Sequence, residues 1–187
     1  MANKPYVIGI CGGTCSGKST ISEIINAELG GRRKIIVIHM DTYYKRPGFT
    51  TIAPITRIEY HEANHPDSLE VERMRGDFTA AANDPGNDIV IIEGLFAFYF
   101  DDIRERLDLK VYIDLKSDER MYRRIKRWIN RTTLEDIVNR YLDTVRYRHD
   151  EFVEPLRWHA DIVINGTLEA NLGTRILLTY IKTQLES

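Results

Sequence analysis

A glycine-rich segment that follows a short apolar run constrains this chain more than any other feature. Residues 12–19 read GGTCSGKS and fit the pattern G-x-x-x-x-G-K-[ST] at every fixed position. Glycines let the backbone curl so that successive N–H groups point inward at phosphate oxygens. The apolar run at 7–10 is typical of a buried parallel strand, and an apolar stripe at positions 21, 24, 25 and 29 is typical of a helix. The sequence therefore predicts a strand, a phosphate-binding loop and a helix in succession.

Each position of this loop has an expected role in binding a nucleoside triphosphate. The backbone N–H groups of the loop and the N-terminus of the following helix would bind the phosphates. Lys18 would reach the β- and γ-phosphates, and the Ser19 hydroxyl would ligate Mg²⁺. The residues expected at the nucleotide in this way are Gly12, Gly13, Thr14, Cys15, Ser16, Gly17, Lys18, Ser19 and Thr20.

Composition narrows the class of protein. The formal net charge of −2 argues against a general nucleic-acid-binding surface. There is no stretch of about 18 apolar residues and no signal-peptide pattern, so we expect a cytoplasmic protein that does not bind a membrane. Cys11 and Cys15 are too few for a closed zinc site and are expected to be reduced thiols. We expect residues 1–187 to form one domain with its own core.

Four more apolar runs have the length of buried strands, and they cover residues 34–39, 88–94, 110–115 and 161–166. Because the strands are apolar on both faces and alternate with helical patterns, we expect an α/β fold with a five-stranded parallel sheet and helices on both sides. Helices are predicted over 134–149 and 169–185. The inner face of the last one is predicted to hold Leu172, Ile176, Leu177, Tyr180 and Ile181.

Two acidic residues are predicted at the carboxyl ends of strands, where ligands bind in open α/β sheets. Glu93 ends the run at 88–94 and has the placement of a Walker B acid, so we expect it to hold Mg²⁺ together with Ser19. Asp41 follows the run at 34–39. There it could accept the proton of an attacking hydroxyl, although a turn or cap residue would occupy the same position.

The segment after Asp41 is the least regular part of the chain. Residues 42–80 hold several prolines and are expected to form an excursion that binds the acceptor, because long loops of compact domains are usually functional or mobile. Within this excursion, Ser68 is predicted to cap a helix over 69–75.

Residues 117–133 are expected to form a lid with a cationic helix. Ser117 is predicted to cap it, and its arginines fall at i, i+3, i+4, i+7 and i+11: Arg120, Arg123, Arg124, Arg127 and Arg131. Like charges on one stripe repel, so we expect them to face the triphosphate, with a solvated face or a nucleic-acid surface as the alternatives. These arginines, Arg123 and Arg127 among them, are expected to bind the nucleotide and to neutralise charge on the transferring group.

Together these parts describe phosphoryl transfer to a small-molecule hydroxyl acceptor. A GTPase-type switch would need an [NT]-K-x-D motif, and residues 115–118 read LKSD, which lacks the Asn or Thr. A non-catalytic nucleotide-binding protein would have no use for Asp41, Lys18 and Glu93 together.

The chain resembles the uridine kinase/phosphoribulokinase family of P-loop kinases. The resemblance rests on the phosphate-binding loop and on residues 41–45 (DTYYK), 64–68 (NHPDS), 93–99 (EGLFAFY), 123–127, 152–155 and 160–164. It implies strand order 2-3-1-4-5, ATP and Mg²⁺, and transfer of the γ-phosphate to a primary hydroxyl, the 5′-hydroxyl of a ribonucleoside. It also implies that Asp41 is the base, that Tyr44 and Asn64 lie at the acceptor, that Arg124 contacts the acceptor sugar and that Arg127 contacts the ATP phosphates.

Departures from the family pattern fall on the acceptor and the lid. Residues 68–92 lack the Y-D-F-x-x-H-x-R hairpin pattern, Asn64 stands where the family has a ribose-binding Asp, residues 131–133 replace an R-G-R tip, and Arg140 replaces a pyrimidine-contacting Gln. Nicotinamide riboside, a sugar phosphate or pantothenate therefore stay open as acceptors. Tetramers occur among uridine kinases, which leaves a homo-oligomer open.

Overall fold

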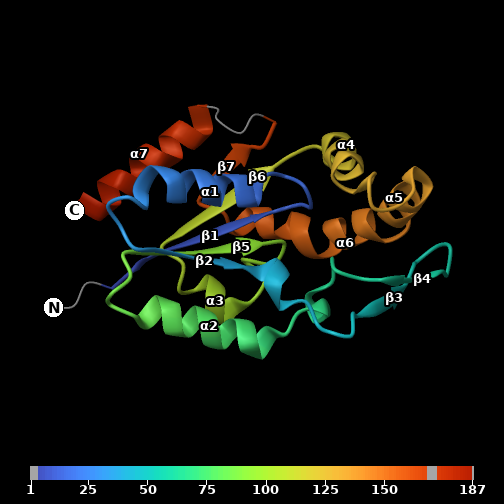
Figure 1. Cartoon of the computed structure of the whole chain (residues 1–187), viewed down its shortest axis with the longest axis horizontal. Coiled ribbons are helices and arrows are strands. Elements are labelled where there is room, and N and C mark those ends of the chain that lie inside the picture. The colour runs from blue at the N-terminus through green and yellow to red at the C-terminus, as the bar shows by residue number, and fades with distance from the viewer. Residues whose placement is uncertain (1–3, 168–171, 187) are drawn as a thin grey trace.

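The centre of the molecule is a parallel sheet of five strands (Figure 1). The computed structural model describes residues 4–167 and 172–186. The strands are β1 (Tyr6–Gly12), β2 (Ile35–His39), β5 (Ile89–Gly94), β6 (Leu109–Asp114) and β7 (Ile162–Asn165). Their order across the sheet is β2-β5-β1-β6-β7, and all neighbours are parallel. Numbered among themselves these strands have the order 2-3-1-4-5, so the α/β fold and its strand order are confirmed.

Both faces of the sheet are covered, which explains why its strands are apolar throughout. On one face, Ile8 and Ile10 of β1 pack with α1 (Lys18–Leu29) and α7 (Leu172–Glu186). On the other face, Val7 and Cys11 belong to a core that includes α2 (Val71–Asn83). A short helix, α3 (Asp101–Arg104), follows β5 on that second face (Figure 1).

A nearly continuous helical path follows β6. It consists of α4 (Ser117–Trp128), α5 (Leu134–Arg140), the π-helix η3 (Tyr141–Val145), α6 (Arg146–Arg148), the π-helix η4 (His149–Val153) and the 3₁₀ helix η5 (Glu154–His159). The path narrows to 3₁₀ geometry at Pro155, which has no N–H to donate to a helical hydrogen bond. The helix predicted over 134–149 starts at the expected residue, Leu134, but the helical path continues beyond 149 to His159.

The excursion after β2 contains a hairpin that the sequence analysis did not predict. Its antiparallel strands are β3 (Thr50–Ile52) and β4 (Glu59–His61), and they pair apart from the main sheet. The 3₁₀ helices η1 (Met40–Tyr43) and η2 (Pro66–Ser68) lie before and after it. In Figure 1 the hairpin projects from the body of the protein below α5.

Several predicted helix details were wrong. Ser68 belongs to η2, and the helix behind it runs over Val71–Asn83 because the alanines at 80–82 continue it. Ser117 is the first residue of α4 rather than its cap, since Lys116 holds the cap position. The buried stripe of α7 runs through Thr174, Leu177 and Ile181. Three residues predicted on that inner face are exposed, namely Leu172, Ile176 and Tyr180, and the predicted start at 169–171 lies outside the described residues.

Among the described residues, no helix combines the length and the apolar character needed to cross a membrane.

Candidate active site

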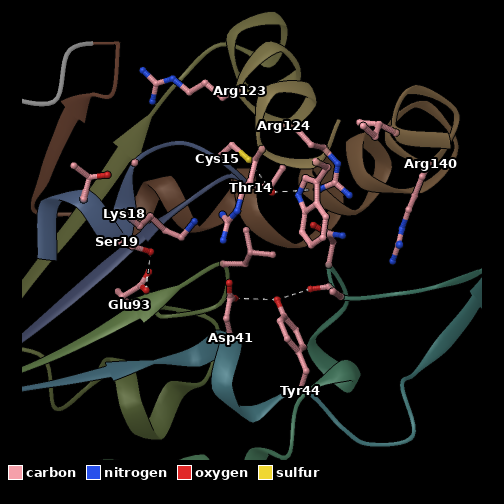
Figure 2. A pocket seen from close by; sticks show the side chains of 18 of the residues that line it. Thr14, Cys15, Lys18, Ser19, Asp41, Tyr44, Glu93, Arg123, Arg124 and Arg140 are labelled. Carbon is pink, nitrogen blue, oxygen red and sulfur yellow. Dashed lines mark hydrogen bonds between the residues drawn. The ribbon is translucent and has the colours of Figure 1, made fainter. Parts of the chain in front are cut away.

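The carboxyl ends of the central strands open into a cavity of about 660 Å³. The phosphate-binding loop, η1, the segment after β4, and helices α4 and α5 surround it (Figure 2). The predicted site residues that line it are Thr14, Cys15, Gly17, Lys18, Ser19, Thr20, Asp41, Tyr44, Asn64, Glu93, Arg123, Arg124 and Arg127. Gly12, Gly13 and Ser16 shape the loop without lining the cavity. Parts of the chain far apart in sequence are thus brought to one place.

Two glycines give the loop its shape. Gly12 has φ +148°, and a Cβ there would lie 2.5 Å from the carbonyl oxygen of Ile113 on the neighbouring strand. Gly17 has φ +105° and precedes the first residue of α1. Within the loop, the Lys18 Nζ donates to the carbonyl oxygen of Gly13 at 3.0 Å. Any other side chain at position 12 or 17 would strain the backbone. The conformation of the loop therefore explains why the motif has glycine at these two positions.

Ser19 and Glu93 meet at the start of α1. The Ser19 hydroxyl donates to Glu93 Oε1 at 3.0 Å, and the side chain of Glu93 is almost fully buried. His39 Nδ1 lies 2.7 Å from the same oxygen, because β2 and β5 pair with His39 opposite Glu93. Sequence reasoning missed His39, although the register of two parallel strands could have suggested it.

The pair Ser19 and Glu93 fits a magnesium ion. Mg²⁺ prefers hard oxygen ligands and usually combines one or two protein ligands with phosphate oxygens and water. Among the described residues, no group of three or more His, Cys, Asp or Glu could hold a metal. Ser19 and Glu93 offer two oxygen ligands of the kind that Mg²⁺ prefers.

Asp41 faces the loop from the opposite side of the cavity (Figure 2). The Tyr44 hydroxyl lies 3.1 Å from Asp41 Oδ1 and 2.9 Å from the carbonyl oxygen of Ala63, and its single proton is shared between these two acceptors. Burial, followed by the charge of Asp41, raises the pKa of Tyr44 well above its usual value. Tyr44 therefore stays a neutral donor that orients the Asp41 carboxylate.

The arginines of the lid helix do not all face the cavity, which corrects the expectation of a single anion-binding face. Arg123, Arg124 and Arg127 line the cavity. Arg120 is buried behind the loop instead, where its Nε donates to the carbonyl oxygen of Leu115 at 3.0 Å. Arg131 lies beyond the end of α4 and stacks on the ring of Trp128. Helix packing turns the first arginine inward, and the helix ends before the last.

The cavity arginines have different surroundings. Arg123 Nη2 donates to the carbonyl oxygens of Gly166 at 2.8 Å and Thr167 at 3.0 Å, which ties α4 to the segment after β7. Arg124 is half-buried, and its Nη1 donates to the Thr14 hydroxyl at 3.5 Å. Burial lowers the pKa of the Arg124 guanidinium. A half-buried guanidinium beside the phosphate-binding loop favours an anionic ligand.

Other cavity residues were not expected from the sequence. Trp128, Thr132, Asp136 and Ile137 come from α4, α5 and their connection. Arg140, placed by resemblance at a base-reading position, lines the cavity and donates through Nη2 to the backbone oxygen of His61. It therefore also joins α5 to the hairpin.

The chain is similar to known kinases in sequence and in fold. The model of the Phosphoribulokinase / Uridine kinase family matches residues 57–172. A uridine kinase of Clostridium tetani is 33% identical over 207 residues, which cover 100% of this chain and 99% of that protein. The structure of a possible uridine kinase from Bacillus stearothermophilus has a TM-score of 0.55 at 17% identity, over 87% of this chain and 90% of that one. A shikimate kinase from Acinetobacter baumannii has a TM-score of 0.57 at 19% identity, over 97% and 96% of the two chains. The two structures share the fold.

Proposed function

This chain belongs to the Phosphoribulokinase / Uridine kinase family, and from that premise we propose that it phosphorylates the 5′-hydroxyl of a ribonucleoside with ATP. Membership of the family makes it a phosphotransferase with an alcohol group as acceptor. The relatives named uridine kinase support a nucleoside as that acceptor. The nucleoside itself is left to experiment, since the family's base-contacting pattern is absent from this sequence.

One observation carries the proposal: a carboxylate stands across a single cavity from a phosphate-binding loop. Asp41, oriented by Tyr44, lines the same cavity as Lys18. A hydroxyl bound between them has a base on one side and a phosphoryl group on the other. Such positioning, together with charge stabilisation, accounts for most of the catalysis of phosphoryl transfer.

The chemistry follows from this placement. Asp41 accepts the proton of the acceptor hydroxyl while the oxygen of that hydroxyl forms a bond to the γ-phosphorus. The bond from this phosphorus to the bridging oxygen of ADP breaks at the same time. Lys18 and Arg127 neutralise charge on the transferring group. Ser19 and Glu93 would hold Mg²⁺, which when bound neutralises phosphate charge.

A panel of acceptors tests the proposal. ADP release would be measured with Mg²⁺-ATP and uridine, cytidine, nicotinamide riboside, ribulose 5-phosphate or pantothenate. We expect turnover with a ribonucleoside. Turnover with the sugar phosphate or pantothenate alone would show that the acceptor is not a ribonucleoside, while the protein would still be a kinase. Binding of ATP without turnover on any acceptor would favour a non-catalytic, regulatory protein.

Replacing the proposed base gives a sharper test. We expect Asp41→Asn to lower kcat by a factor of about 10²–10⁴, because an amide cannot accept the proton. The KM for ATP should stay within about twofold, since Asp41 is not expected to bind the phosphates. Steady-state kinetics with the preferred acceptor would measure both values.

The matched control is Asp101→Asn. Asp101 is exposed, pairs with Arg104 at 2.7 Å and does not line the cavity. Its replacement should leave kcat unchanged. If Asp41→Asn turned over as fast as this control, Asp41 could not be the base.

A further inference from the structure

We propose that Glu62 is a positioning residue of the acceptor site. Glu62 binds the amide nitrogen of Asn64, so that the amide oxygen is left for the acceptor. Asn64 would then recognise a hydroxyl or another hydrogen-bond donor, and not a phosphate or carboxylate. This inference rests on the proposed function, because it concerns how the same acceptor is held.

The contacts between Glu62 and Asn64 are buried and close. Glu62 is 4% exposed and Asn64 is 7% exposed. Glu62 Oε1 accepts from the backbone N–H of Asn64 at 2.6 Å and from its Nδ2 at 3.0 Å. One carboxylate oxygen therefore fixes both the backbone and the side chain of Asn64, which lines the cavity.

The chemistry of the pair determines which way the amide faces. If the amide of Asn64 were turned over, its oxygen would lie 3.0 Å from a carboxylate oxygen. Two acceptors at that distance repel, whereas an N–H facing a carboxylate makes a strong, charge-assisted bond. In the described part of the chain, no donor is bound to Asn64 Oδ1. That oxygen is the group that Asn64 can offer to a ligand.

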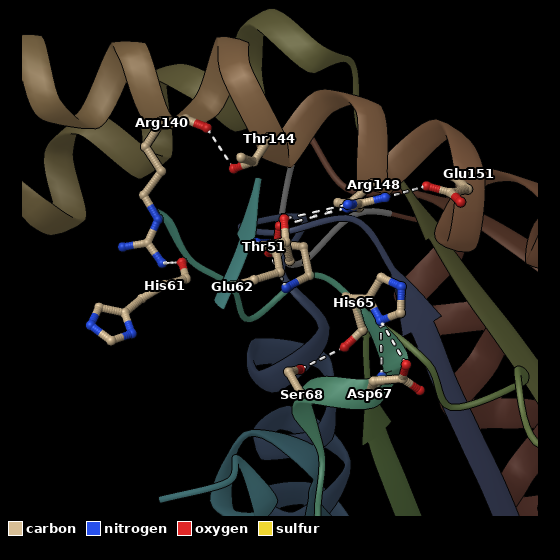
Figure 3. A network of polar contacts seen from close by, with 11 residues as sticks. Thr51, His61, Glu62, His65, Asp67, Ser68, Arg140, Thr144, Arg148 and Glu151 are labelled. Carbon is tan, nitrogen blue, oxygen red and sulfur yellow. Dashed lines mark hydrogen bonds and ion pairs between the residues drawn. The ribbon is translucent and has the colours of Figure 1, made fainter. Parts of the chain in front are cut away.

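Glu62 is itself held from the helical path. Arg148 Nε lies 3.8 Å from Glu62 Oε2, and Arg148 also pairs with Glu151 at 2.7 Å (Figure 3). Its Nη2 donates to the hydroxyl of Thr51 on the hairpin at 3.4 Å. A buried carboxylate needs such a partner. The ion pair therefore holds the Glu62 side chain in place behind Asn64.

The same short segment is fixed to the proposed base. The Tyr44 hydroxyl shares its proton between the carbonyl oxygen of Ala63 and Asp41 Oδ1. Asn64 and Asp41 therefore lie on one wall of the cavity with a shared support. An acceptor whose hydroxyl is bound by Asn64 would be held in a fixed relation to Asp41.

The family pattern makes the pair testable, because it has Asp where this chain has Asn64. In this chain Asn64→Asp would place a second carboxylate about 3 Å from Glu62. We expect this variant to raise the KM for the acceptor roughly tenfold, with the KM for ATP unchanged. Adding Glu62→Gln should recover most of that loss, because it removes one of the two carboxylates that repel each other.

The control for the double variant is Asp143→Asn. Asp143 accepts from Tyr60 at 2.8 Å and from Thr56 at 3.0 Å, so it joins the hairpin to the helical path without touching Asn64. In a protein that carries Asp143→Asn, the change Asn64→Asp should raise the KM for the acceptor roughly tenfold, as it does in the otherwise unmodified protein. If Asn64→Asp raised the KM for the acceptor by the same factor whether residue 62 were Glu or Gln, the inference would be overturned.

A second readout does not depend on turnover. In the NMR spectrum one side-chain N–H proton of Asn64, assigned by its absence in Asn64→Asp, should be shifted downfield by the carboxylate. It should move upfield in Glu62→Gln and stay in place in Asp143→Asn. An unchanged resonance in Glu62→Gln would overturn the positioning role. If no acceptor were phosphorylated, the proposed function would fail while this resonance still decided the role of Glu62.

Discussion

Two cysteines near the phosphate-binding loop differ in chemistry because they differ in burial. Cys11 is fully buried in β1, and its Sγ donates to the carbonyl oxygen of Leu95 at 3.2 Å. Burial raises the pKa of the Cys11 thiol to about 12. Cys15 is partly exposed and lines the cavity. Because the thiolate is the reactive form, iodoacetamide at pH 8 should alkylate Cys15 and spare Cys11. Mass spectrometry of the labelled peptides would measure both.

Nucleotide should slow the labelling of Cys15, since the same loop is proposed to bind phosphates. Unfolded protein should label at both cysteines, which controls for detection of Cys11. Alkylation of Cys11 in the folded protein at the rate seen in the unfolded one would contradict the burial argument.

Residues whose position follows from the local chain could be predicted from the sequence. The loop residues, Asp41 and Glu93 follow strands directly, so their meeting at one sheet edge needed no side-chain detail. His39 and Glu62 could not be found in this way. The contact between His39 and Glu93 joins residues 54 positions apart and depends on strand register. Spacing also could not tell that Arg120 turns into the interior while Arg124 lines the cavity.

Helix α5 begins with a side-chain cap. The Thr133 hydroxyl accepts from the backbone N–H of Asp136 at 3.1 Å and donates to the Asp136 carboxylate at 2.7 Å. Thr133→Ala removes both bonds and should lower the free energy of unfolding by about 1 kcal/mol. Urea denaturation followed by circular dichroism would measure the loss.

Thr133→Ser is the matched control for this cap. Serine keeps the hydroxyl, so its free energy of unfolding should stay near that of the unmodified protein. Equal losses in the Ala and Ser variants would show that the methyl group, and not the cap, stabilises the start of α5.

The strands of the main sheet could be predicted because each is a continuous apolar run. The hairpin could not, since β3 and β4 have three residues each and neither holds a fully buried side chain. Contacts with the helical path stabilise it instead, as the bonds from Tyr60 to Asp143 and from Arg140 to His61 show. Such a hairpin depends on partners that lie far away in sequence, and no local period reveals it.

At the scale of the whole molecule, one helical path joins the two halves of the cavity. Its residues Asp143 and Arg148 bind the hairpin and Glu62 beside Asn64. On the side of the phosphate-binding loop, the next residue along, His149, is buried near Arg120. Arg120 packs against Gly13 of the loop. Stability of this junction should therefore respond to the charge of His149.

Burial lowers the pKa of His149 to about 3, and the nearby charges of Arg120 and Lys18 add to the effect. Glu154 Oε2, 3.3 Å from Nε2, favours the charged imidazolium, but burial and the two cations outweigh it. In the unfolded chain the ordinary pKa is 6.5. Below that pH the unfolded state takes up a proton that the folded state does not. The contribution of neutral His149 is therefore complete above pH 6.5 and is lost as the pH falls toward 3.

This sign predicts the pH dependence of stability. Between about pH 5.5 and 4, His149 should lower the free energy of unfolding by up to about 1.4 kcal/mol per pH unit. Carboxylates titrate in the same range, so the quantity to compare is the slope of the free energy of unfolding against pH. Urea titrations at several pH values would measure it for the unmodified protein and for His149→Gln, which has no titrating group at this position. The variant should have the shallower slope, while the exposed His159→Asn control should keep the original one. Parallel slopes in all three proteins would mean that His149 gains a proton in the folded state as readily as in the unfolded state, and the junction beneath the loop would then tolerate a third positive charge.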